Sequence, residues 1–338
     1  MYIFLISLIL AVISVKAAIA DTVEEFYRGK YVTIAIGFSA GGDYDLRARL
    51  LARHMDRFIP GTPTLIARNM PGAGGIAATN WLAKLAPLDG TSLLMASQNT
   101  PLIQALGTPG VEFDARQFFW IGNTTNSPNL ISVWAGRGVT SVEDAKGREV
   151  TVGATGVGSG SYYYPIAANI IGGTRFKIVT GYPGGNDINI AMERGEVDGR
   201  GSNSLAAWLA TRPSWISEKK IIHLVQIALN PHPDLIDVPL LSDLATTDID
   251  KQAMHLLAAE TAMARSIAAS PEVPLERVAA LRKAFNLTLT SKEFLSEADK
   301  LGFDINAASG EEVQSIVNNI VNAPIPVIQR VREILNTK

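Results

Sequence analysis

Short runs rich in β-branched residues alternate along this chain with segments whose apolar residues recur at helical spacing. Such alternation predicts βαβ units and a mostly parallel sheet with helices on its faces. The expected strands are residues 31–36, 64–67, 92–96, 149–153, 176–180 and 197–200, and the expected helices are residues 46–55, 75–85, 161–171 and 188–195. The fold class is therefore α/β.

Two further apolar runs, Asn129–Trp134 and Ile221–Ala228, lack the glycine-rich turns that follow the other expected strands. We interpret these two runs as crossover strands that join two lobes, and 338 residues are enough for two domains of ordinary size. The predicted division is residues 21–130 with 229–338 for lobe one and residues 131–228 for lobe two, with residues 250–338 mainly helical.

The first twenty residues differ from the rest of the chain. Tyr2–Val15 is almost entirely apolar, Lys16 ends the run, and small residues follow at Ala18 and Ala20. The run is shorter than the roughly 20 apolar residues that a membrane-spanning helix needs. We therefore predict a secretory signal peptide over residues 1–20 that is cleaved after Ala20.

Composition argues against several functions. The chain has no cysteine, so disulfides, thiolate nucleophiles, thiolate metal sites and a lipid anchor on cysteine are excluded. The formal net charge is −2 and charges of both signs are scattered, so we expect no nucleic-acid partner. The four histidines lie far apart, with no spacing typical of a metal site or a catalytic base. We expect no metal and no cofactor.

Glycine-rich turns follow the first two expected strands, at Phe38–Asp45 and Asn69–Gly75. Free N–H groups at a helix start bind an anion without needing a lysine, so the two turns could converge on one carboxylate. The alternative is a pair of ordinary turns. Asp45 is expected to be the N-cap of the next helix. The candidate ligand-binding residues in lobe one, including two after the third strand, are Ser39, Ala40, Gly41, Asp43, Tyr44, Asp45, Gly72, Ala73, Gly74, Ser97 and Gln98.

Lobe two contains three comparable loop segments, Thr155–Ser161, Tyr182–Asp187 and Arg200–Asn203, which are rich in hydroxyl, amide and N–H donors. A role in turn formation would explain any one of these side chains, so the hypothesis rests on the whole set. The candidate ligand-binding residues here are Thr155, Gly156, Ser159, Ser161, Tyr182, Gly184, Asn186, Asp187, Arg200 and Ser202.

Two enzyme-like motifs lack their usual context. Gly37–Gly41 matches the G-x-S-x-G elbow of serine hydrolases, but the expected helix begins several residues after Ser39 rather than directly after it. The spacing of Gly72, Gly74 and Ala77 loosely matches a dinucleotide fingerprint, but no acid stands at the end of the next expected strand. We therefore expect no catalytic residues and a protein that is not an enzyme.

Taken in order along the chain, several runs resemble the substrate-binding receptors of tripartite tricarboxylate transporters, also called Bug proteins. The matching positions are Gly41-Gly42 with Asp45, Ala48 and Arg49; Asn69 with Pro71–Gly75; Ala86-Pro87 with Asp89–Thr91; Gly195–Asp198; and Val238–Leu240. The resemblance covers nearly the whole chain after residue 20. It implies a type II periplasmic-binding-protein fold, in which two α/β lobes joined by two crossover strands enclose a ligand cleft.

The same resemblance implies a monomeric periplasmic receptor. It would capture a small carboxylate (a di- or tricarboxylate, an amino acid or an aromatic acid) and deliver it to the membrane components of the transporter. Ser39–Asp45 and Gly72–Gly74 would hold one carboxylate, and the lobe-two loops would set specificity. The alternative is a periplasmic ligand-sensing protein that reports to a membrane sensor kinase.

Asp43 departs from the family, which usually has an uncharged residue at this position, and Phe38–Ala40 stands where the family usually has prolines. An ionised carboxylate beside an anion site would repel a carboxylate ligand. We therefore predict one of two arrangements. Asp43 either points outward at the start of the helix, or contacts an amino or hydroxyl group of the ligand.

Overall fold

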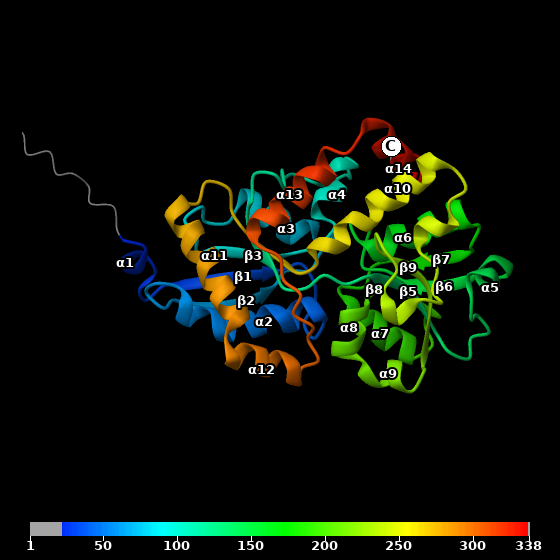
Figure 1. The fold of residues 1–338 in the computed structure, drawn as a ribbon, viewed down its shortest axis with the longest axis horizontal. Coiled ribbons are helices and arrows are strands. Elements are labelled where there is room, and N and C mark those ends of the chain that lie inside the picture. Colours follow the sequence, from blue (N-terminus) through cyan, green and yellow to red (C-terminus); the bar gives the residue numbers. More distant parts are fainter. Residues whose placement is uncertain (1–21, 337–338) are drawn as a thin grey trace, which may run out of the picture.

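The computed structural model describes residues 22–336, so the expected signal peptide over residues 1–20 lies outside the described part. Two five-stranded sheets, each with helices around it, lie side by side (Figure 1). Their strand orders are β2-β1-β3-β10-β4 and β7-β6-β8-β5-β9. The α/β architecture expected from the sequence is confirmed.

The first sheet contains β1 (Tyr31–Ile36), β2 (Thr64–Asn69), β3 (Ser92–Ala96), β4 (Phe119–Asn123) and β10 (Ser266–Ala269). β1 is parallel to β2 and β3, while β10 pairs antiparallel with β3 and β4. The sequence analysis missed β4 and β10. β10 is four residues long and buried throughout, so it shows no alternation of polar and apolar residues.

The second sheet contains β5 (Asn129–Trp134), β6 (Val150–Gly153), β7 (Phe176–Val179), β8 (Gly199–Ser204) and β9 (Ile221–Ile227). β6 is parallel to β7 and β8, and β5 lies antiparallel between β8 and β9. The two runs interpreted as crossover strands are therefore neighbours, β5 and β9. Residues 200–203, which we expected to form a loop, lie inside β8, because its glycine and small polar residues are paired with β5.

Helices cover both sheets. Those packed around the first sheet are α2 (Asp43–Met55), α3 (Ile76–Lys84), α4 (Thr100–Ala105), α11 (Leu275–Thr290), α12 (Lys292–Lys300) and α13 (Gly310–Val321). Those of the second region are α5 (Val142–Gly147), α6 (Gly160–Gly172), α7 (Gly185–Glu193), α8 (Leu205–Thr211) and α9 (Pro213–Ser217). The short helix α1 (Val23–Tyr27) precedes β1.

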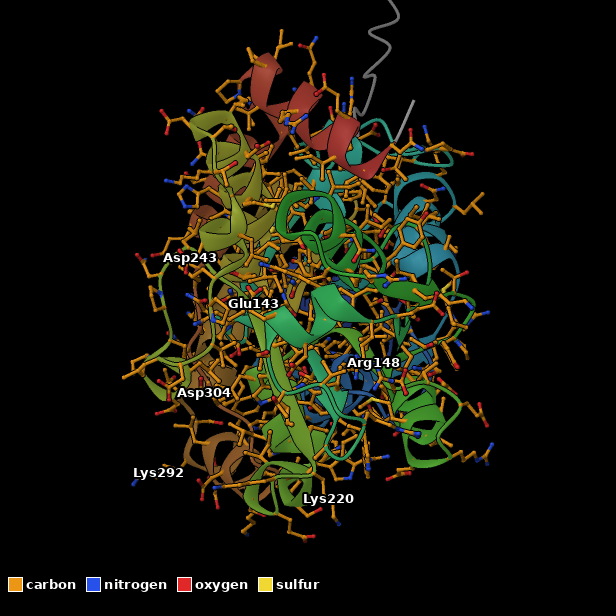
Figure 2. All side chains as sticks on the ribbon, turned by 90° about the vertical axis from the view of Figure 1, so that its right-hand side faces the viewer. Glu143, Arg148, Lys220, Asp243, Lys292 and Asp304 are labelled. Atoms are coloured by element: carbon orange, nitrogen blue, oxygen red, sulfur yellow. The ribbon has the colours of Figure 1, made fainter. Side chains whose placement is uncertain are left out.

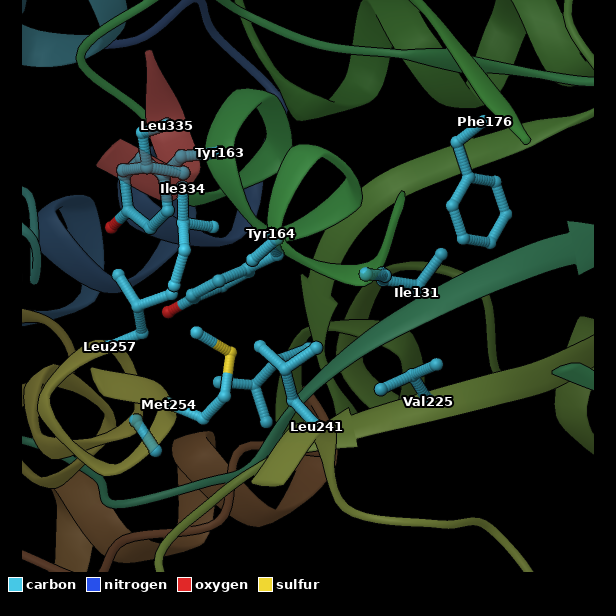
Figure 3. Close-up of a cluster of buried hydrophobic side chains, with 14 of the residues drawn as sticks. Ile131, Tyr163, Tyr164, Phe176, Val225, Leu241, Met254, Leu257, Ile334 and Leu335 are labelled. Carbon is cyan, nitrogen blue, oxygen red and sulfur yellow. The ribbon is translucent and has the colours of Figure 1, made fainter. Parts of the chain in front are cut away.

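The C-terminal part of the chain contacts both regions. α10 (Asp248–Ala259) and α14 (Ile325–Leu335) pack against each other and against α6 of the second region. Tyr164, Met254, Leu257 and Ile334 bring these three helices together in one buried cluster (Figure 3). The division into lobes at residues 130 and 228 stays a prediction. The chain after residue 228, which was assigned to lobe one, packs against helices of both regions.

Most charged side chains lie on the outside of the molecule, as Glu143, Arg148 and Lys292 do in Figure 2. Buried charges are therefore informative where they occur, because removing a charge from water is costly unless it is paired. Among residues 22–336, no helix is long and apolar enough to cross a membrane.

Candidate functional site

A cavity lies between the two sheets, with an empty volume of about 730 Å³ that includes space open to solvent. Its walls come from the loops that follow β1, β3 and β6, from strand β8, and from Arg265 just before β10. Loops at the carboxyl ends of strands are where open α/β sheets bind ligands. The cavity is therefore the candidate ligand site.

About half of the residues predicted from the sequence line this cavity. Those that do are Gly41, Asp43, Tyr44, Ser97, Gln98, Thr155, Ser159, Ser161, Asn186, Arg200 and Ser202. Those that do not are Ser39, Ala40, Asp45, Gly72, Ala73, Gly74, Gly156, Tyr182, Gly184 and Asp187. The role of each residue at a ligand stays a prediction.

Part of the lining was not among the predicted residues, although Phe38, Gly42, Gly160, Gly185 and Asn203 lie within the predicted loop segments. The additional residues are Phe38, Gly42, Asn99, Asn129, Gly160, Gly185, Asn189, Asn203, Ser204, Ala207, Thr211 and Arg265. Asn99 directly follows the predicted Ser97 and Gln98, so the end of β3 already indicated it. Arg265 had no such signal, because it stands before a strand that the sequence did not reveal.

Asp45 and Asn69 fix the loop after β1. Asp45 Oδ2 accepts a hydrogen bond from the Gly41 N–H at 2.9 Å, and Asn69 Nδ2 donates to Asp45 Oδ1 and to the Phe38 carbonyl, both at 2.9 Å. The expectation that Asp45 is the N-cap is wrong, because the helix begins at Asp43 and Gly42 is its N-cap. Asp45 is the third helical residue, and its side chain reaches back to the loop.

Asp43 is buried between two arginines. Its Oδ1 accepts from Arg47 Nε at 2.9 Å, and its Oδ2 accepts from Arg265 Nε. Burial alone would raise the pKa of the Asp43 carboxyl, but Arg265 and Arg47 hold the pKa below its usual value. The expectation that Asp43 points outward is wrong. Its charge is already paired, so it does not oppose a bound anion as a free carboxylate would.

The cavity wall has hydrogen-bond donors without acceptors. Within the described chain, the buried side-chain atoms that lack a partner include Arg200 Nε, Arg265 Nη1, Asn129 Nδ2 and Asn203 Nδ2. All four residues line the cavity. Burial, and then the neighbouring charge of Arg265, lower the pKa of Arg200 to about 9. The site is therefore electropositive and rich in donors.

Several predicted site residues lie where loops of the two regions touch. Ser39 Oγ donates to Asp187 Oδ2 at 2.6 Å, and the Ser39 N–H donates to the Pro183 carbonyl at 3.2 Å. A Cβ added at Gly74 would lie 2.7 Å from the carbonyl carbon of Gly158. These residues join the walls of the cavity and do not face its interior, so the structure represents a closed cleft.

A second buried carboxylate, Glu260, connects the two regions behind the cavity wall and is not itself part of the lining. Glu260 accepts hydrogen bonds from Tyr163 Oη at 2.6 Å and from Tyr164 Oη, both on α6. Gln98 Nε2, which follows β3, donates to it at 3.3 Å. Burial raises the pKa of Glu260 to about 7, although the three hydrogen bonds act in the opposite direction.

Known proteins match this chain in two ways: one is similar in sequence over part of the chain, and several solved structures share its fold. No protein-family model matches the chain. Over 102 residues it is 36% identical to Protein BugT of Bordetella pertussis, and this match spans only 29% of the chain and 30% of BugT.

Solved structures match over a much larger part of the chain. The periplasmic binding protein BugD has a TM-score of 0.71 at 19% identity, covering 91% of this chain and 98% of its own. An R. palustris protein with adipate has a TM-score of 0.70 at 20% identity, covering 91% and 97%. MatC from Rhodopseudomonas palustris with bound malate has a TM-score of 0.67 at 20% identity, covering 90% and 99%. The expected periplasmic-binding-protein fold is confirmed.

Proposed function

We propose that this chain, which is related in sequence to a Bug protein and has the fold of BugD and MatC, is a periplasmic solute-binding receptor. It captures a small carboxylate in the cleft and delivers it, as a monomer, to the membrane components of a tripartite tricarboxylate transporter. Two of the similar structures hold adipate and malate, which are both small acids.

The observation that carries this proposal is the set of unpartnered donors on the cavity wall. Arg200, Arg265, Asn129 and Asn203 each contribute a buried N–H group with no acceptor in the described structure. A buried donor left unsatisfied costs about 1–3 kcal/mol. A carboxylate supplies two acceptor oxygens with about four lone-pair sites, together with a negative charge. It complements this wall better than a neutral or cationic solute.

The lining favours binding over catalysis. The described residues that line the cavity include no histidine, lysine or glutamate that could serve as a general base. Their one carboxylate, that of Asp43, is paired with Arg47 and Arg265. Ser39, the serine of the hydrolase-like motif, donates its hydroxyl hydrogen to Asp187 and lies outside the lining. We therefore assign the cavity to capture and release of a ligand.

The proposal is tested by a thermal-shift screen of di- and tricarboxylates, amino acids and aromatic acids, with neutral sugars and esters as controls. A ligand present at 100 times its dissociation constant adds about 2.7 kcal/mol of stability, which is readily measured. We expect at least one acid and none of the neutral compounds to raise the unfolding temperature. Stabilisation by neutral compounds alone, or hydrolysis of an ester at the cavity, would contradict the proposal.

A further inference from the structure

Two guanidinium groups from different sheets face the same cavity. Arg200 stands in β8 of the second sheet, and Arg265 directly precedes β10 of the first sheet. They were brought together only by folding, since 64 residues separate them in the sequence. The lining of the described cavity contains one carboxylate, that of Asp43.

Arg200 is held by the second region alone. Its Nη1 donates to the Gly185 carbonyl at 3.2 Å and to Asn189 Oδ1 at 3.1 Å, and its guanidinium lies over the Trp208 ring. These partners are neutral. The Nε atom of Arg200 has no partner. The charge of Arg200 is therefore fixed in position without a counter-charge.

Arg265 has a different set of partners. Its Nε donates to Asp43, its Nη2 donates to Ser204 Oγ at 2.7 Å, and its Nη1 has no partner. Asp43 is shared with Arg47, which is also buried. One acid thus pairs with two guanidinium groups, and Arg200 has no acid of its own. The like charge of Arg265 disfavours the charged form of Arg200.

Excess positive charge inside a closed cleft is costly unless an anion pairs with it. We propose that an acid group of the ligand lies between Arg200 and Arg265, accepting from the free Nε of one and the free Nη1 of the other. This inference rests on the proposed function and adds the residues that select the ligand's charge. Because the two arginines belong to different sheets, the bound acid group also favours closure of the cleft.

The test measures binding of malate, adipate, citrate, glutamate and benzoate by isothermal titration calorimetry. Each acid is compared with its uncharged amide or methyl ester. The proteins are wild type, Arg200→Gln, Arg200→Lys and the matched control Arg194→Gln, whose side chain is 70% exposed in the same region. The unfolding temperature of each protein without ligand reports whether the variant folds.

For every acid that binds wild type, we expect Arg200→Gln to weaken binding by about 30-fold or more, as loss of a buried charge pair does. Arg200→Lys keeps the positive charge, so its affinity for the acid should fall less than that of Arg200→Gln. Arg194→Gln should leave the affinity unchanged. The ligand-free Arg200→Gln protein is expected to be at least as stable as wild type, because an unpaired buried charge has been removed. If Arg200 had only a structural role, the unfolding temperature of the ligand-free Arg200→Gln protein would instead be lower than that of wild type.

The inference and the function fail in different ways. If an acid binds wild type and Arg200→Gln within a factor of three, or if its amide binds equally well, the arginine pair does not hold the acid group and the receptor function stands. If none of the five acids binds wild type at 10 mM while a neutral solute does, both are overturned.

Discussion

Two buried carboxylates lie between the sheets, and they are stabilised in opposite ways. Asp43 is paired with two guanidinium groups, which lower the pKa of its carboxyl, whereas Glu260 accepts hydrogen bonds from three neutral donors and has a pKa raised to about 7. The comparison shows that hydrogen bonds from neutral groups do not offset burial here, while adjacent positive charges do. The region around Asp43 therefore carries fixed charge, and the region around Glu260 titrates near neutral pH.

The largest effect is expected from Asp43→Asn. This change leaves Arg47 and Arg265 buried without their shared counter-charge, and breaking a buried ion pair in this way costs about 3–5 kcal/mol. The free energy of unfolding from urea denaturation measures the loss. Glu24→Gln, which breaks an exposed pair with Arg28, is the control and should cost less than about 1 kcal/mol. Equal effects of the two changes would show that Asp43 is not needed to pair these charges.

Glu260→Gln tests the second of these two carboxylates. A carboxyl whose pKa is raised in the folded protein contributes stability below its unfolded pKa of about 4.5, and loses it as pH rises through about 7. Between pH 4 and pH 8 wild type should therefore lose on the order of 3 kcal/mol relative to Glu260→Gln. The difference between the two proteins isolates Glu260, because their other titrating groups are the same. A difference that does not change with pH would contradict a raised pKa.

Gly74→Val should separate closure of the cleft from the state of Glu260. A side chain at Gly74 would meet the backbone of Gly158 in the closed form, and φ of +71° disfavours a β-branched residue. We expect ligand affinity to fall by tenfold or more, while the pH dependence assigned to Glu260 persists. Gly173→Val is the matched control, with φ of +72° and no atom within 4 Å of an added Cβ. Similar losses of affinity in both variants would show that backbone strain, and not contact across the cleft, is responsible.

The sequence predicted the architecture well where strands were long enough to show a pattern. β1, β3 and β5 were predicted with the bounds that the structure has. β10 was missed because four small buried residues carry no periodicity, and Arg265 was missed with it. Arg200 was identified, but at the end of a strand that was expected to stop there, whereas β8 continues to Ser204. What could not be predicted is pairing between distant residues, such as Asp43 with Arg265, since it depends on where β10 is inserted in the first sheet.

Ser39→Ala should have the smallest effect on stability. It tests whether a contact at the edge of the cavity contributes as much as the contacts of the buried Asp43 and Glu260 carboxylates. The Ser39 hydroxyl bonds Asp187 across the cleft, and Asp187 is partly exposed, so water can replace the lost bond. Removing one such hydrogen bond costs about 0.5–1.5 kcal/mol. We expect a decrease in affinity of roughly tenfold at most, measured by calorimetry with the acid that stabilises wild type best. Because Asp187 keeps its charge in contact with water, the free energy of unfolding should change less than in Asp43→Asn.

A loss of several kcal/mol in the free energy of unfolding would show that the bond between Ser39 and Asp187 contributes as much as the buried ion pairs do. Loss of an ester-hydrolysing activity on this substitution would instead identify Ser39 as a nucleophile and contradict a binding role for the cavity.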